Sequence, residues 1–322
     1  MACPDTGSSA STAEARPRQI TMSISRHRTP PAAWWRRPFI LKHTTARPAA
    51  PANLTAAAAG SELPEGDYYA TGATSMAKAT RMDTADALED ILHDGSAAYL
   101  MVSVPPESWE RLLKAAGVRE PAFASSVPEC ACNMSSRLEH EAHWRMLLAG
   151  GAAATVGMHF HVDALPTSSW QLQLLGAKRW HLCPPTPKGG YCGGSVDDPD
   201  AAYSPCGTPA EEEPAAGCLD ATVRRGEALY YPEQWWHRTS NAGAAPMVSV
   251  SRSLVTPANA RAMAAALQLF CRRALAVARD AYAPACLALV PCLRRWAAIA
   301  DDRVAHAIPA HGSVLGWASE WT

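Results

Sequence analysis

Short runs of strand-forming residues fill the chain between residues 142 and 255, with Gly, Pro, Asn or Ser between them. They read HWRMLL, VGMHFHV, SWQLQLL, KRWHLC, EALYY, WWHRTS and MVSVSRSLV. Many short strands separated by turns are typical of antiparallel sandwiches and barrels. This feature therefore predicts a mainly β fold before any single residue is considered.

The segments outside this series predict flanking elements. Residues 37–42 and 97–103 are predicted as strands, and residues 84–95 and 108–117 as short helices that each end at a glycine. The stretch 186–225 interrupts the strand series and is rich in Gly, Pro and acidic residues, without periodicity. It is predicted to be a long mobile loop at the mouth of the barrel.

The two ends of the chain differ in character from the middle. Residues 1–33 are rich in Ser, Thr, Ala, Pro and Arg, which predicts a disordered tail, with an organelle transit peptide as the alternative. Thr256 and Pro257 are predicted to start a long helix, so 34–256 would be the main domain and 257–322 a helical extension. That helix could pack on the barrel or form a dimer interface, and packing is preferred.

Composition restricts the partners and the compartment. A formal net charge of -1 gives no argument for nucleic acid, and no apolar run is long enough to span a bilayer. The ten cysteines form no CxxC pair, and the first residues do not have the pattern of a signal peptide, so secretion is not expected. We therefore expect mostly reduced thiols and an intracellular protein, nuclear or cytoplasmic. The oligomeric state is not indicated.

Three residues that can bind metals lie close together in MHFHVDALPTSSW, residues 158–170. His159, His161 and Asp163 alternate, which would place them on one face of a strand. With the distant His237, His161 and Asp163 make a set of two histidines and one carboxylate. Such a set leaves three positions of an octahedral metal open, as in non-haem Fe(II) oxygenases.

A second polar feature lies in SWQLQLLGAKRWHLCPP, residues 169–185. Gly176 fits a two-residue hairpin turn, which would place Gln171, Gln173 and Lys178 on one face with Trp180. Two amides and an ammonium suit a barrel interior that holds a carboxylate ligand. A solvated sheet face with an exposed lysine is the alternative. The serines that alternate in MVSVSRSLV also suit a polar interior.

In their order along the chain, HVD, SSWQLQLLGAKRWHLCPP and GEALYYPEQWWH resemble the JmjC family. Within it, the similarity is greatest to the protein hydroxylases and proposed arginine demethylases once called phosphatidylserine-receptor proteins. The resemblance covers residues 37–256 and implies a double-stranded β-helix, a jelly-roll barrel that binds Fe(II) and 2-oxoglutarate and uses O2.

The resemblance also implies roles for individual residues. His161, Asp163 and His237 resemble the iron ligands, and His159 is then a histidine of the barrel interior or mouth. Lys178 resembles the lysine that binds the far carboxylate of 2-oxoglutarate. Three further positions match co-substrate contacts, namely Tyr99, Gln171 and Ser251. Two departures from the family pattern concern the same pocket: Gln171 replaces Asn, and Met158 stands where a Thr is expected, unless Thr155 takes that place.

By this resemblance, decarboxylation of 2-oxoglutarate to succinate and CO2 is coupled to hydroxylation of a protein or peptide side chain. Hydroxylation of an N-methyl group would end in demethylation with loss of formaldehyde. Two alternatives stay open: a catalytically silent cupin-type barrel that only binds, and a cupin metalloenzyme without 2-oxoglutarate, in which His159 would be a fourth ligand. The complete ligand set and Lys178 favour the oxygenase. The substrate cannot be identified from these residues.

Overall fold

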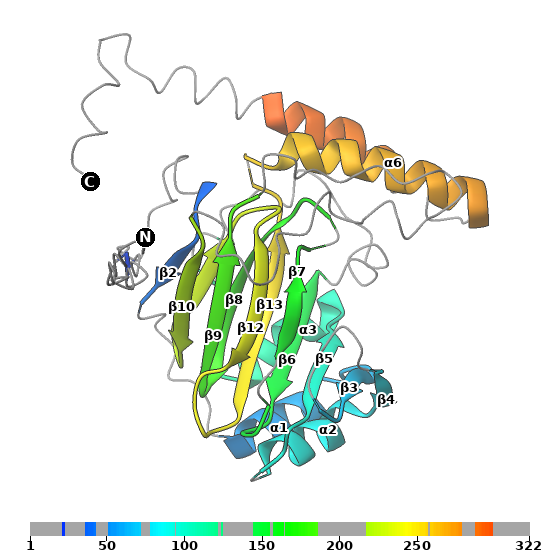
Figure 1. Cartoon of the computed structure of the whole chain (residues 1–322). Helices are drawn as coiled ribbons and strands as arrows, with labels where there is room; N and C mark the ends of the chain where they lie inside the picture. Colours follow the sequence, from blue (N-terminus) through cyan, green and yellow to red (C-terminus); the bar gives the residue numbers. More distant parts are fainter. Residues whose placement is uncertain are drawn as a thin grey trace, which may run out of the picture.

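The computed structural model describes residues 21–22, 36–42, 51–71, 78–93, 95–121, 124, 144–154, 157–163, 165–185, 217–256, 258–278 and 287–298. Within these ranges the strands form two sheets. The large sheet has the order β1-β2-β11-β8-β13-β6-β5-β3-β4, and the small sheet has the order β10-β9-β12-β7. The small sheet faces the viewer in Figure 1.

Eight consecutive strands make the barrel. Their bounds are β6 Arg145–Gly150, β7 Met158–His161, β8 Ser168–Leu175, β9 Ala177–Cys183, β10 Leu219–Arg224, β11 Ala228–Tyr231, β12 Trp236–Asn241 and β13 Met247–Leu254. Four of them, in the order β11-β8-β13-β6, belong to the large sheet, and the other four are the small sheet. The pairs between these strands are antiparallel. This is the double-stranded β-helix that the sequence predicts.

The remaining strands extend the large sheet at both edges. β1 (Thr21–Met22) and β2 (Phe39–Leu41) lie beside β11, whereas β5 (Tyr99–Ser103), β3 (Gly66–Tyr69) and β4 (Thr80–Met82) continue from β6. Three helices cover this extended region: α1 (Pro51–Gly60), α2 (Thr84–Leu92) and α3 (Pro106–Ala115). Figure 1 shows them together on the side of the large sheet away from the small sheet.

Alternation along the large-sheet strands separates a helix-covered face from the barrel interior. On β13, Val248 and Val250 belong to the apolar core beneath the helices, together with Leu172 of β8. The residues next to them along the strands, Ser251 on β13 and Gln171 on β8, line the interior instead. Successive side chains of a strand point to opposite faces, so the predicted serine-bearing face of β13 lies inside the barrel.

The predicted hairpin at Gly176 is wrong. β8 pairs with β11 and β13, whereas β9 pairs with β10 and β12, so the chain passes from one sheet to the other at this glycine. Gly176 has φ of +64°, and a Cβ there would lie 2.4 Å from the backbone oxygen of Pro246. A hairpin turn and a crossing between sheets both need glycine in this conformation, and the local sequence does not distinguish them.

Two helices lie at one end of the barrel. α6 (Ala260–Ala278) and a helix over residues 287–298 run together in Figure 1. Met263 and Leu267 of α6 pack against Leu293, and this cluster continues to Trp144 and Val255 at the barrel end. α6 therefore packs on the barrel, as preferred from the sequence. It begins at Ala260, three residues later than predicted.

Three other expectations need correction. Residues 219–224, inside the predicted loop 186–225, form strand β10, while 186–216 lie outside the described residues. β1 lies inside the segment 1–33 that was predicted to be disordered, and it pairs with β2. A disulfide joins Cys183 to Cys218, and Cys271 and Cys292 are also disulfide-bonded, so the expectation of mostly reduced thiols fails for these four. None of the helices described is long and apolar enough to cross a membrane.

Candidate metal centre

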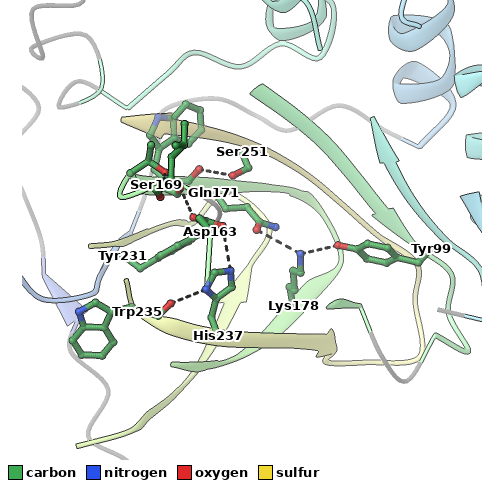
Figure 2. Close-up of polar contacts among 12 residues, drawn as sticks. Tyr99, Asp163, Ser169, Gln171, Lys178, Tyr231, Trp235, His237 and Ser251 are labelled. Atoms are coloured by element: carbon green, nitrogen blue, oxygen red, sulfur yellow. Dashed lines mark hydrogen bonds and ion pairs between the residues drawn. The ribbon is translucent and has the colours of Figure 1, made fainter. Parts of the chain in front are cut away.

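His161, Asp163 and His237, which we call the triad, come together inside the barrel. His161 ends β7 and pairs in register with His237 on β12, and Asp163 follows two residues after the strand. The metal-binding atoms of the three side chains lie within 4.8 Å of one another. His237 Nε2 lies 3.8 Å from Asp163 Oδ1, as Figure 2 shows.

An irregularity in β7 shapes the triad. His237 is paired with His161, but Thr239, two residues on, is paired with Met158, three residues away. Such a bulge breaks strict alternation, so Met158 and His161 both line the interior. Of the three residues predicted to share one face, His161 and Asp163 are described, and both line the interior. The side chain of His159 and the whole of Thr155 lie outside the described residues.

Neighbouring groups orient two of the triad side chains. His237 Nδ1 donates to the backbone oxygen of Trp235 at 2.9 Å, because a carbonyl oxygen can only accept. The lone pair of this ring is thereby on Nε2, the atom that faces Asp163. The other oxygen of that carboxylate, Oδ2, accepts from Ser169 Oγ at 3.0 Å and from the Tyr231 hydroxyl at 3.2 Å.

Tyr231 donates its hydroxyl proton to Asp163. Burial, and after it the charge of Asp163, raises the pKa of this phenol well above its ordinary value. The phenol therefore stays protonated at ordinary pH and holds one carboxylate oxygen in place.

The donor set fits a divalent transition metal. Two imidazoles and one carboxylate oxygen suit Fe(II), and three protein ligands leave positions for exogenous ligands. A histidine that donates to a backbone carbonyl and a carboxylate that accepts from hydroxyls are held by the kind of outer contact that orients metal ligands in proteins. The residues present thus match the expected group in both ligand type and outer support.

Lys178 lies in the same interior as a buried ammonium. It is 1% exposed, and burial lowers its pKa from 10.5 to about 7. Its Nζ donates to the Tyr99 hydroxyl at 3.3 Å and to Gln171 Oε1 at 3.5 Å (Figure 2). It also lies 5.1 Å from the ring centroid of Trp180. Burial is the only cause of its pKa change, so within the described chain no carboxylate neutralises it.

The two other predicted co-substrate residues lie nearby but differ in their contacts. Gln171 Nε2 donates to Ser249 Oγ, which orients its carbonyl oxygen toward Lys178. Ser251 donates to the backbone oxygen of Trp170 at 3.1 Å and lines the same cavity. The longer side chain of Gln171 thus reaches both the ammonium and the neighbouring strand β13.

A cavity of about 290 Å³ connects these groups. It is lined by the triad, by the cluster around Lys178 and by four apolar side chains: Met101, Met146, Leu148 and Met158. The cavity therefore offers a metal-binding end, a cationic end and apolar walls. A small dianion that also binds a metal would match the two polar ends.

Four contributors were not singled out from the sequence. Ser169 and Tyr231 hold Asp163, Ser249 orients Gln171, and Trp235 contributes only its carbonyl. Ser169 lies in the quoted TSSW motif and Tyr231 in EALYY, so a strand-pairing prediction for β8 and β11 would have found both. A backbone carbonyl carries no side-chain signal and could not have been found.

Comparisons with known proteins give related sequences. The chain is 31% identical over 132 residues to lysine-specific demethylase JMJ21 of Arabidopsis thaliana, covering 36% of this chain and 13% of that protein. It is 31% identical over 99 residues to JmjC domain-containing protein 8 of Homo sapiens, covering 31% of this chain and 34% of that protein. It is 31% identical over 101 residues to the bifunctional arginine demethylase and lysyl-hydroxylase psr-1 of Caenorhabditis briggsae, covering 28% of this chain and 25% of that protein.

These matches span only 13–34% of the relatives' own lengths. No protein-family model matches the chain. Among solved structures, the X-ray structure of E. coli ycfD has a TM-score of 0.42 and 16% identity, covering 74% of this chain and 56% of that one. The sequence matches confirm the predicted resemblance to JmjC-domain proteins.

Proposed function

We propose that this chain, whose sequence is similar to JmjC-domain proteins, is an Fe(II)- and 2-oxoglutarate-dependent oxygenase that hydroxylates a protein side chain. The observation that carries the proposal is the presence, in one cavity, of the triad and a buried ammonium that no carboxylate among the described residues neutralises. A barrel that only binds has no need for both features.

The triad would hold Fe(II) through its two imidazoles and one carboxylate. Bound there, the metal supplies the redox chemistry that couples decarboxylation of 2-oxoglutarate by O2 to hydroxylation of a C–H bond. Ser169 and Tyr231 hold one oxygen of Asp163, and the Trp235 carbonyl holds the His237 ring. These contacts keep the ligand atoms in place before the metal arrives.

Lys178 would bind the carboxylate of 2-oxoglutarate that is remote from the metal. A buried ammonium without a counter-charge is unfavourable, and a carboxylate ligand removes that cost. Tyr99 and Gln171 position the ammonium, and they can contribute a hydroxyl and an amide to the same carboxylate. The apolar walls exclude water from the space between the two ends.

A protein substrate is proposed from the relatives alone. Their names describe demethylation and hydroxylation of lysine and arginine. Hydroxylation of a stable carbon would leave an alcohol, whereas hydroxylation of an N-methyl group would lead to demethylation. Mass spectrometry of lysine- and arginine-containing peptides, methylated and unmethylated, separates these outcomes by the added oxygen or the lost methyl group.

Calorimetric binding of 2-oxoglutarate to the Mn(II)-loaded protein tests the pocket assignment. Lys178→Ala should weaken binding by about 1.5–3 kcal/mol, as for a lost hydrogen bond to a charged group. Arg179→Ala is the matched control, because Arg179 is the next residue on β9 and is exposed. Equal affinities in the wild type and in Lys178→Ala would refute the assignment.

A further inference from the structure

A second group of metal-binding residues lies on the outer face of the small sheet. Trp180 faces the cavity and Leu182 packs in the barrel core, so His181 and Cys183 point to the opposite face of β9. Across the β9–β10 pair, Asp220 stands opposite His181, and Cys218 is bonded to Cys183. This group is separate from the triad, which lies inside the barrel.

The geometry of His181 is that of a metal ligand. Its Nδ1 lies 2.8 Å from Asp220 Oδ1, and a carboxylate accepts only, so Nδ1 carries the proton. In the neutral ring the lone pair is then on Nε2, which lies 3.4 Å from Cys183 Sγ. A disulfide sulfur has no proton to share with that lone pair. Carboxylate–histidine pairs of this kind fix the ring of metal-binding histidines.

The ligand atoms of His181, Cys183 and Cys218 lie within 4.8 Å of one another. Thiolate and imidazole ligands favour Zn(II), with sulfur at about 2.3 Å and nitrogen at about 2.0–2.1 Å. Two thiolates and a neutral imidazole would neutralise the ion, and water would take the fourth position. His181 has 26% of its side chain exposed, which gives a metal ion access.

We propose that His181, Cys183 and Cys218 form a Zn(II) site when the disulfide is reduced, and that the disulfide is the metal-free, oxidised state of the same site. Reduction by a thiol such as glutathione converts the disulfide and two external thiols into two cysteine thiols and one external disulfide. Zn(II) then binds both sulfurs and releases two protons. Both the disulfide and the bound Zn(II) would link Cys183 to Cys218, which are 35 residues apart in the sequence. Either link holds edge strand β10 to β9.

Co(II) titration of the full-length protein tests this proposal independently of the proposed oxygenase. A thiolate ligand gives Co(II) a sulfur-to-metal charge-transfer absorption, whereas Co(II) bound by the triad has no sulfur ligand and lacks it. Protein that is reduced, freed of metal and kept without oxygen should develop this absorption with one equivalent of Co(II). Zn(II) should abolish it by displacement. Oxidised protein should not develop it.

Variants assign the absorption to these residues. Cys183→Ser with Cys218→Ser should remove it, whereas Cys130→Ser with Cys132→Ser, the matched control, should retain it. If the first double variant does not fold, His181→Ala can be purified with its disulfide intact and then reduced. We expect it to bind Co(II) at least 10-fold more weakly, because it loses a ligand.

Asp220→Asn tests the role of the carboxylate, and it should weaken Co(II) binding by about 10–100-fold, as for other outer contacts of metal ligands. Absence of the charge-transfer absorption in the reduced wild type would overturn the proposal. Its persistence in the Cys183→Ser, Cys218→Ser variant, or an unchanged affinity in reduced His181→Ala, would also overturn it.

Discussion

Replacing Lys178 by Met should stabilise the protein, and more so at low pH. Burial lowers the pKa of this ammonium from 10.5 to about 7. Each pKa unit corresponds to about 1.4 kcal/mol, so the charged form costs the folded state about 5 kcal/mol below pH 7. Met has a similar length and no charge, and therefore removes this cost.

The pH dependence follows from proton binding. The unfolded chain keeps a proton on this lysine up to about pH 10.5, and the folded protein only up to about pH 7. The wild type therefore gains stability as the pH rises between these values, because the unfolded state binds more protons. At pH 9 the remaining cost is about 2 kcal/mol, so the advantage of Lys178→Met should fall by about 3 kcal/mol from pH 6 to pH 9.

Urea denaturation of the wild type and Lys178→Met at both pH values measures this change, without 2-oxoglutarate in the buffer. Differences in packing cancel, because they affect both pH values alike. Arg179→Met is the control, and its effect on the free energy of unfolding should be small and independent of pH. If Lys178→Met changed stability equally at pH 6 and pH 9, the account of Lys178 as a buried, uncompensated ammonium would be wrong.

Three further outcomes are expected. The affinity of the Mn(II)-loaded protein for 2-oxoglutarate should fall by up to about tenfold per pH unit above pH 7, because binding then requires proton uptake by Lys178; a flat calorimetric profile from pH 6 to pH 9 would contradict this. Tyr231→Phe should weaken metal binding by about 10–100-fold in chelator competition, through loss of its hydrogen bond to Asp163; unchanged affinity would remove its positioning role. Gly176→Ala should destabilise the fold by at least about 1–2 kcal/mol in urea, because φ is +64°; an unchanged midpoint would argue against the crossing between sheets.

Strand alternation explains why most of the barrel was predictable. Runs such as MVSVSRSLV carry a polar face and an apolar face, and β13 uses them for the interior and the helix-covered side. Strand β10, LDATVR, has weaker alternation and follows a Gly- and Pro-rich stretch, so its sequence predicts a loop. The partner of each strand is set by closure of the barrel, which local sequence does not encode.

The candidate site was also predictable only where it depends on strand alternation and not on strand pairing. The grouping of Gln171 and Lys178 in the interior was expected, although the hairpin used to infer it does not exist. Alternation along each strand sufficed, because β8 and β9 contribute their inward faces to one cavity. The bulge that turns both Met158 and His161 inward could not be predicted, because it depends on the register of β7 against β12.

Release of succinate from 2-oxoglutarate tests the proposed oxygenase most directly. The assay compares the wild type with Fe(II) in air, the wild type under argon, and His237→Ala in air, with 2-oxoglutarate binding measured on the same samples. Our account predicts slow succinate formation by the wild type in air only, because the triad leaves positions open for 2-oxoglutarate and O2. Equal background in all three, from wild-type protein that binds 2-oxoglutarate, would contradict it and indicate a binding barrel.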